Sequence, residues 1–177
     1  KKEEVIESYL DNSILYTHTL LSLSVYFRLN AGLTVPKEAL PHCIAVAITG
    51  FNAGDKVPGY DEMLSKWILQ EVRQNPNVVR SVLYEMWVSS TKFKKGNLPG
   101  FYELIHDPDS QEFLALLSAD VLKVGIYDDH ETVGKLVSVL LLLDQRAALL
   151  IGEVVFNQED LSEEVRAIWI TALFVID

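Results

Sequence analysis

Regularly spaced apolar blocks in residues 128–177 limit what this chain can fold into more than any other feature. Apolar residues dominate 135–143, 146–156 and 165–176, and short polar breaks at Asp144 and at 157–164 separate these blocks. Apolar residues that recur three and four positions apart are typical of amphipathic helices. This part of the chain therefore predicts a helix, a tight turn, a second helix, a loop and a third helix.

The rest of the chain has the same character. Helical spacing recurs over residues 14–29, 39–51, 60–72, 78–88 and 110–124, and the residues between these segments are rich in Pro, Gly, Asn and Asp. No segment alternates as a half-buried strand would. We therefore predict an all-α chain of roughly eight to ten helices in antiparallel hairpins, with residues 89–100 as the longest polar connection. Three tryptophans are predicted to lie in the core: Trp67, Trp87 and Trp169.

Three hairpin junctions resemble one another. Each has a polar turn, often with acidic residues, followed by an apolar helix, and they begin at Asn75, Asp128 and Asp160. The last two begin 32 residues apart, a suitable length for one two-helix repeat. An acidic residue in such a turn is expected to cap the next helix and to favour its positive end.

The segment Asp160-Leu161-Ser162-Glu163-Glu164-Val165-Arg166 resembles the start of the inner helix of a HEAT repeat. The turn at 107–109 is similar to the turn between the two helices of that repeat, and residues 75–177 carry the likeness. The string from Leu98 to Leu104 also resembles the helical-repeat region of large bacterial NACHT or STAND-type proteins.

The resemblance implies antiparallel hairpins stacked as an α-α superhelix, a HEAT/ARM-like solenoid. It also implies a non-enzymatic scaffold or sensor that binds another protein or neighbouring domains of its own chain. We expect residues 1–177 to be one helical-repeat domain excised from a longer polypeptide, and residues 1–74 join the array by continuity alone.

The charge distribution excludes two classes of partner. Residues 1–88 hold 8 basic and 10 acidic side chains, whereas residues 89–177 hold 7 and 15. A nucleic-acid footprint and an anionic membrane surface both require a basic face, so neither is expected. One cysteine, Cys43, rules out an internal disulfide and fits a reducing compartment, so we expect a cytoplasmic protein.

The sequence contains few candidates for chemistry. His42 and Cys43 are neighbours on a predicted helix, so their side chains point about 100° apart and do not form a base–nucleophile pair. Lys92, Lys94 and Lys95 flank Phe93, and this basic stretch is read as a solvated loop, with contact to phosphate or to an acidic partner as the alternative. No residue is assigned as catalytic, cofactor-binding or metal-ligating.

One concentration of acidic and histidine residues supports an alternative function. His106, Asp107 and Asp109 lie in one predicted turn, and Asp128 and Asp129 lie in the next. If both turns fell on one edge of the stack, these groups would suit a divalent metal or a small ligand. The alternative is therefore a small all-α binding domain or enzyme that uses this cluster.

Overall fold

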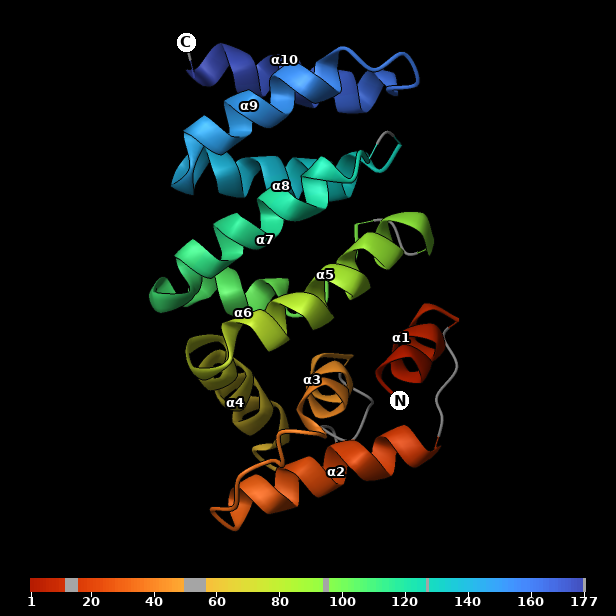
Figure 1. Cartoon of the computed structure of the whole chain (residues 1–177), viewed down its shortest axis with the longest axis vertical. Helices are drawn as coiled ribbons and strands as arrows, with labels where there is room; N and C mark the ends of the chain where they lie inside the picture. The colour runs from red at the N-terminus through yellow and green to blue at the C-terminus, as the bar shows by residue number, and fades with distance from the viewer. Residues whose placement is uncertain (12–15, 50–56, 94–95, 127, 177) are drawn as a thin grey trace.

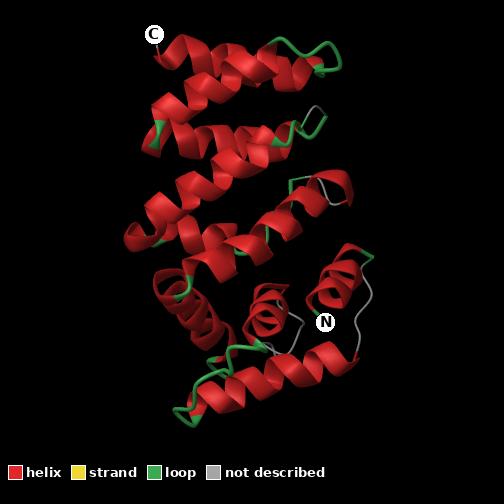
Figure 2. Cartoon of the chain, viewed as in Figure 1, coloured by secondary structure: helices red, strands yellow, loops and turns green. Residues whose placement is uncertain are grey.

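The computed structural model describes residues 1–11, 16–49, 57–93, 96–126 and 128–176. Within these ranges the chain is helical and contains no strand, as predicted (Figure 2). Ten α-helices and one short 3-10 helix are present: α1 (Lys2–Leu10), α2 (Tyr16–Asn30), α3 (Leu40–Thr49), α4 (Tyr60–Gln74), α5 (Pro76–Phe93), α6 (Phe101–His106), η2 (Pro108–Ser110), α7 (Gln111–Lys123), α8 (His130–Leu143), α9 (Gln145–Phe156) and α10 (Glu163–Ile176).

The helices follow one another along the long axis of the molecule, from α2 at one end to α10 at the other (Figure 1). From α5 onward they form two layers, which we call the front layer (α5, α7, α9) and the rear layer (α6, α8, α10). Helix α7 packs on α5, α8 and α9, and α10 packs on both α8 and α9. Helices α7 and α8 thus each touch the next helix and the next but one.

Successive turns alternate between two sides of the molecule. The α5–α6, α7–α8 and α9–α10 connections lie on the right edge in Figure 1, and the α6–α7 and α8–α9 turns lie on the left edge. This alternation follows from the antiparallel hairpins, since each helix carries the chain from one edge to the other. It determines which polar residues of the turns can meet.

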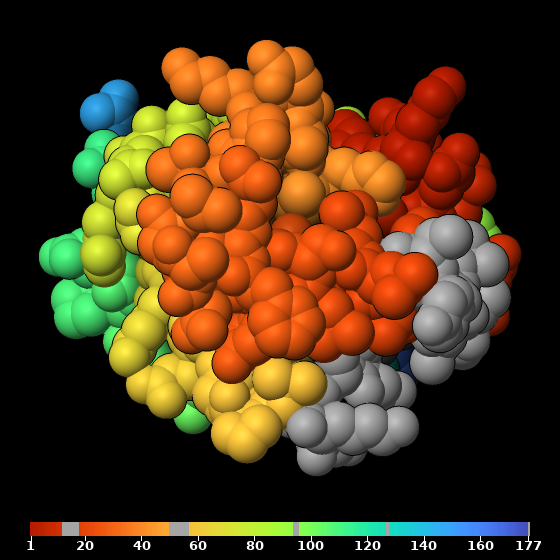
Figure 3. Space-filling view, turned by 90° about the horizontal axis from the view of Figure 1, so that it is seen from below, coloured from red at the N-terminus to blue at the C-terminus, as the bar shows by residue number. Residues whose placement is uncertain are grey.

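The first four helices pack in a different pattern. Helix α3 lies at the centre of this part and contacts α1, α2, α4 and α5, while α2 crosses the end of the molecule (Figure 1). Seen from that end, α2 covers much of the surface (Figure 3). Residues 1–74 therefore form a helical cluster against which the two-layered part begins.

The three tryptophans lie in the core, as predicted. Trp87 and Trp169 are almost fully buried, and Trp67 is 5% exposed. The indole N–H of Trp87 donates to the carbonyl oxygen of Pro99 at 2.8 Å, which satisfies its one polar group. Gly152 lets α9 approach α10 closely, because a Cβ there would lie 3.0 Å from the Trp169 ring.

The boundaries of α5 differ from the prediction. The helix begins at Pro76, a residue suited to a first helical turn because its missing N–H would have no partner there, and it extends to Phe93. Ser90 and Thr91, which were predicted to belong to a polar connection, are buried, and the Thr91 hydroxyl donates to the carbonyl oxygen of Val88 at 2.8 Å. A short polar side chain that bonds its own helix backbone is compatible with a helix interior.

None of the helices in the described ranges combines the length and the apolar character that a bilayer crossing requires.

Candidate binding groove on the right edge

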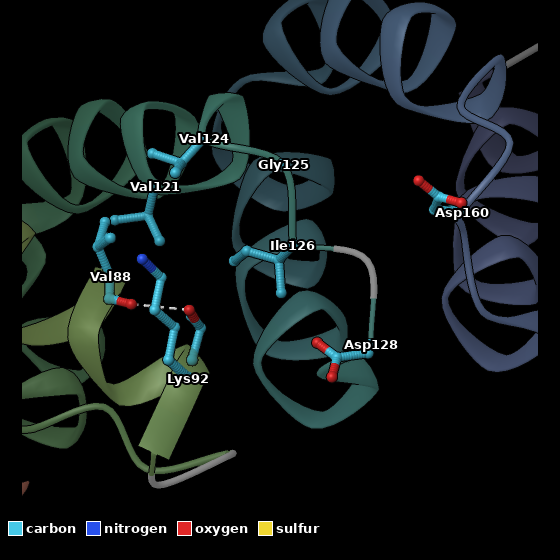
Figure 4. A pocket seen from close by; sticks show the side chains of 9 residues that line it. Val88, Lys92, Val121, Val124, Gly125, Ile126, Asp128 and Asp160 are labelled. Atoms are coloured by element: carbon cyan, nitrogen blue, oxygen red, sulfur yellow. Dashed lines mark hydrogen bonds between the residues drawn. The ribbon is translucent and has the colours of Figure 1, made fainter.

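A cavity of about 510 Å³ lies on the right edge, between the ends of three hairpins (Figure 4). Its wall comes from the last turns of α5 and α7, from the α7–α8 turn and from the α9–α10 turn. The lining residues are Val88, Thr91, Lys92, Val121, Val124, Gly125, Ile126, Asp128 and Asp160.

The α7–α8 turn has the form of a glycine-terminated helix end. Gly125 has φ of 81° and follows α7, and its N–H donates to the carbonyl oxygen of Leu122 at 3.1 Å. Glycine adopts this left-handed conformation without the steric cost that a Cβ brings. The next residue, Ile126, folds back and is 6% exposed, as expected for the apolar residue that follows such a helix end. The turn thereby places an apolar side chain at the floor of the groove.

Charged groups of opposite sign lie on the two sides of this floor. Lys92 extends from α5 toward Val121, while Asp128 and Asp160 lie on the far side of Ile126 (Figure 4). The groove thus combines an apolar floor with one ammonium group and two carboxylates. Among the described residues that line the groove, the Thr91 hydroxyl donates to the carbonyl oxygen of Val88.

Asp129 supports the structure of the groove instead of lining it. Its side chain is 1% exposed and caps α8, where Oδ1 accepts from the backbone N–H of Thr132 at 3.1 Å. Its Oδ2 accepts from the backbone N–H of Gly96 at 3.3 Å, and Thr132 Oγ1 accepts from the same N–H at 3.2 Å. The ammonium of Lys135 donates to the Gly96 carbonyl oxygen. The first two turns of α8 thus hold the α5–α6 connection in place.

The expectation that acids of the turns cap the following helices is right at α8 and wrong at α10. At α10 the Ser162 hydroxyl accepts from the backbone N–H of Val165 at 3.3 Å. Ser162 directly precedes the helix, whereas Asp160 lies three residues before its start and is exposed in the groove. A serine at the N-cap position satisfies the orphan N–H as well as an acid does.

Arg166 does not bind a turn of another hairpin. Its guanidinium donates to the carbonyl oxygens of Phe156 and Gln158, at 3.5 and 3.4 Å, and lies 5.5 Å from the centroid of the Phe156 ring. All these contacts are within the α9–α10 hairpin.

The predicted acid and histidine cluster does not assemble. His106, Asp107 and Asp109 lie on the left edge, whereas Asp128 and Asp129 lie on the right edge. Helix α7 separates the two groups, and its 13 residues span about 20 Å. The alternative required both turns to fall on one edge, and this condition is not met because a single helix joins them.

The left-edge residues also have partners of their own. The Arg73 guanidinium binds Asp107 Oδ1 at 2.8 Å and Asp109 Oδ2 at 3.2 Å, which ties α4 to the turn before α7. His106 Nδ1 lies 2.8 Å from the carbonyl oxygen of Tyr102. No group of three or more His, Cys, Asp or Glu side chains in the described ranges is arranged to hold a metal ion.

The other candidates for chemistry lie in the N-terminal part. The rings of His18 and His42 meet edge to face, with centroids 6.2 Å apart, and burial lowers the pKa of both imidazoles from 6.5. Cys43 is buried, and burial raises the pKa of its thiol. Burial favours the protonated thiol, which is a weak nucleophile.

The predicted basic stretch lies partly on described residues. Lys92 and Phe93 are the last residues of α5, and Phe93 is exposed. Lys94 and Lys95 lie outside the described residues.

Comparisons with protein-family models, with curated proteins and with solved structures gave no match. The assignment of function therefore depends on the geometry alone.

Sequence reasoning did not identify the groove. It singled out Asp128, Asp160 and Lys92 for separate reasons, but nothing in their spacing brings a residue of α5 to the α9–α10 turn. The 32-residue interval between the two aspartates was the useful signal, because equivalent positions of successive hairpins lie on the same edge.

Proposed function

We propose that this chain is a non-enzymatic helical-repeat segment that binds another protein or a neighbouring domain, as a scaffold or sensor in a larger cytoplasmic protein. The array is of the stacked α-α type, and residues 75–177 form its regular part. The observation that carries the proposal is the equivalent burial of α8 and α10 at the 32-residue interval.

Most positions 32 residues apart in α8 and α10 have the same burial, although Thr132 and Val139 are buried while Glu164 and Thr171 are exposed. Val133 and Val165 are both fully buried, and Leu140 and Ala172 are at most 1% exposed. An offset of 34 residues gives the same agreement between α7 and α9. The pairs buried in both of those helices are Leu114 and Ala148, Leu117 and Ile151, Ser118 and Gly152, and Val121 and Val155.

Matching burial supports a repeated unit, because each hairpin then covers the same face of the hairpin before it. The contacts of α7 with α9 and of α8 with α10 fit that arrangement. A linear array of hairpins offers extended surfaces, and its turns form a row along each edge. The groove on the right edge is the concave site that such a row produces here.

A photo-crosslinking experiment tests the binding function. Val124 lies in the groove and is 46% exposed, so p-benzoylphenylalanine placed there should crosslink a partner in cells that naturally express the full-length protein. Gln111, exposed on the left edge, is the matched control position. The purified partner should then bind the wild-type protein more tightly than the Asp160→Lys variant. Identical crosslinked species at both positions would overturn the proposal.

A further inference from the structure

Two of the most exposed apolar residues occupy equivalent positions in successive helices of the rear layer. Leu142 of α8 is 79% exposed and Phe174 of α10 is 85% exposed, and the two residues are 32 positions apart. Helices α8 and α10 pack directly against each other. The shared register therefore makes these side chains successive members of one row on the rear layer.

The end of the stack does not explain this exposure. Leu142 belongs to a helix that α10 already covers, so the row of Leu142 and Phe174 faces sideways and would remain exposed beside any stacked neighbour.

The outward face of each helix changes from acidic to apolar along its length. Residues spaced at 0, 4, 7 and 11 positions lie on one side of a helix. In α8 these are Glu131, Lys135, Ser138 and Leu142, and in α10 they are Glu163, Ala167, Ile170 and Phe174. All eight are exposed.

The charge on this face is negative near the right edge. Glu131 and Glu163 are equivalent residues in the first turns of α8 and α10. The one cation in the two rows, Lys135, donates to the Gly96 carbonyl oxygen and keeps its charge, so two carboxylates and one ammonium group give this end a net charge of −1. The face thus presents two carboxylates at one end and large apolar side chains at the other, about 16 Å away along the helices.

We propose that this rear face binds a basic amphipathic helix of a partner protein. The partner's apolar residues lie on Leu142, Ile170 and Phe174, and its lysines or arginines lie on Glu131 and Glu163. An amphipathic helix laid along two parallel helices is a common mode of peptide recognition, read as anchors at helical spacing. This inference rests on the proposed binding function and names the chemistry of the partner.

A second copy of the same face is a poorer occupant. Two copies placed in parallel would bring Glu131 and Glu163 against the same residues of the other copy, and like charges in contact repel each other. An antiparallel arrangement would bury these carboxylates against Leu142 and Phe174, which costs free energy because a buried charge loses its hydration. A basic partner satisfies both ends of the face.

The test uses a peptide of about 18 residues, long enough to cover the face, with leucine on one side of the helix and lysine on the other. Controls are a leucine–glutamate peptide of the same pattern and a leucine–lysine peptide with scrambled order. Fluorescence anisotropy should detect binding of the amphipathic basic peptide only. Leu142→Ser combined with Phe174→Ser should weaken it at least about tenfold, the loss expected when central apolar anchors are removed.

A matched variant distinguishes binding at this face from nonspecific hydrophobic binding. Leu150 of α9 is 55% exposed but belongs to the front layer, so Leu150→Ser should leave the affinity unchanged. Glu131→Gln combined with Glu163→Gln should weaken binding and reduce its dependence on salt. Urea unfolding should show that these exposed substitutions leave the fold intact.

Three results would overturn the inference. They are equal binding of the acidic peptide, an equal loss of affinity in Leu150→Ser, and self-association of the protein that Phe174→Ser abolishes. If the peptides fail while the Val124 crosslinker still captures a specific partner, the rear-face inference falls and the proposed binding function stands.

Discussion

Gly96 offers the sharpest test of how the hairpins are joined. Its backbone N–H and carbonyl are both bound by α8, through Asp129, Thr132 and Lys135. Its φ is 77°, and a Cβ built there would lie 3.0 Å from Glu131 Cβ and 1.9 Å from Glu131 Oε2. Gly96→Ala should therefore destabilise the protein for two separable reasons.

The magnitude follows from the two terms. A non-glycine residue in the left-handed conformation costs about 1–2 kcal/mol. The Glu131 carboxylate is exposed and can swing away, but its Cβ is fixed by the backbone of α8, so the close contact adds about 1–3 kcal/mol of overpacking. The expected loss is about 2–5 kcal/mol, a large share of the stability typical of a domain.

Gly32→Ala is the matched control. Gly32 has φ of 70° and nothing within 4 Å of the position of an added Cβ, so the same substitution there should cost only the conformational term of about 1–2 kcal/mol. Urea unfolding followed by tryptophan fluorescence measures both variants. Adding Glu131→Gly to Gly96→Ala removes the opposing Cβ and should recover part of the loss, less the cost of about 1 kcal/mol that glycine brings to a helix. A Gly96→Ala variant no less stable than Gly32→Ala would refute the contact between the α5–α6 connection and α8.

Other predictions concern the last hairpin and the N-terminal part. Val165 is fully buried, so Val165→Asp should unfold the α9–α10 hairpin and lower the melting temperature. Arg166→Ala should have a smaller effect, because the contacts of Arg166 with carbonyl oxygens are partly exposed. Equal melting temperatures for the wild type and Val165→Asp would contradict the assignment of this hairpin. Burial lowers the pKa of His18 and His42, so below 6.5 the unfolded chain binds more protons and stability should fall as pH drops from about 7 to 5. That loss should shrink in a variant that combines His18→Gln and His42→Gln, as urea titrations at each pH would show. A loss of unchanged size would argue against the buried pair. Cys43 should resist a thiol reagent until urea unfolds the chain, and rapid labelling of the native protein would disprove its burial.

Helix formation was predictable because it depends on local pattern. The apolar spacing in 128–177 predicted α8, α9 and α10. Asp144 lies at the predicted break between α8 and α9 and caps α9, because its Oδ1 accepts from the Ala147 N–H at 3.0 Å. The extension of α5 to Phe93 was not predictable, because Ser90 and Thr91 are polar and their burial depends on distant residues. Tertiary packing overrides local polarity in such cases.

The edge on which a turn lies depends on how many helices separate it from another turn. The spacing of Asp128 and Asp160 predicted equivalent turns, and both residues line one groove. The grouping of His106 with Asp128 failed because an odd number of helices between two turns sends them to opposite edges. Lys92 lines the groove because α5 packs on α7, and the sequence spacing between these two helices does not predict that packing.

The acidic balance of the second half has a consistent place in the fold. Asp128 and Asp160 line the groove, and Glu131 and Glu163 begin the rear face, so four carboxylates from two equivalent turns gather toward the right edge. Such a concentration raises the local density of cationic partners and speeds their encounter in a salt-dependent way. The apolar floor at Ile126 and the apolar end of the rear face then supply contacts that salt does not screen. A partner with basic residues beside aliphatic ones would therefore be attracted by the edge and retained by either surface.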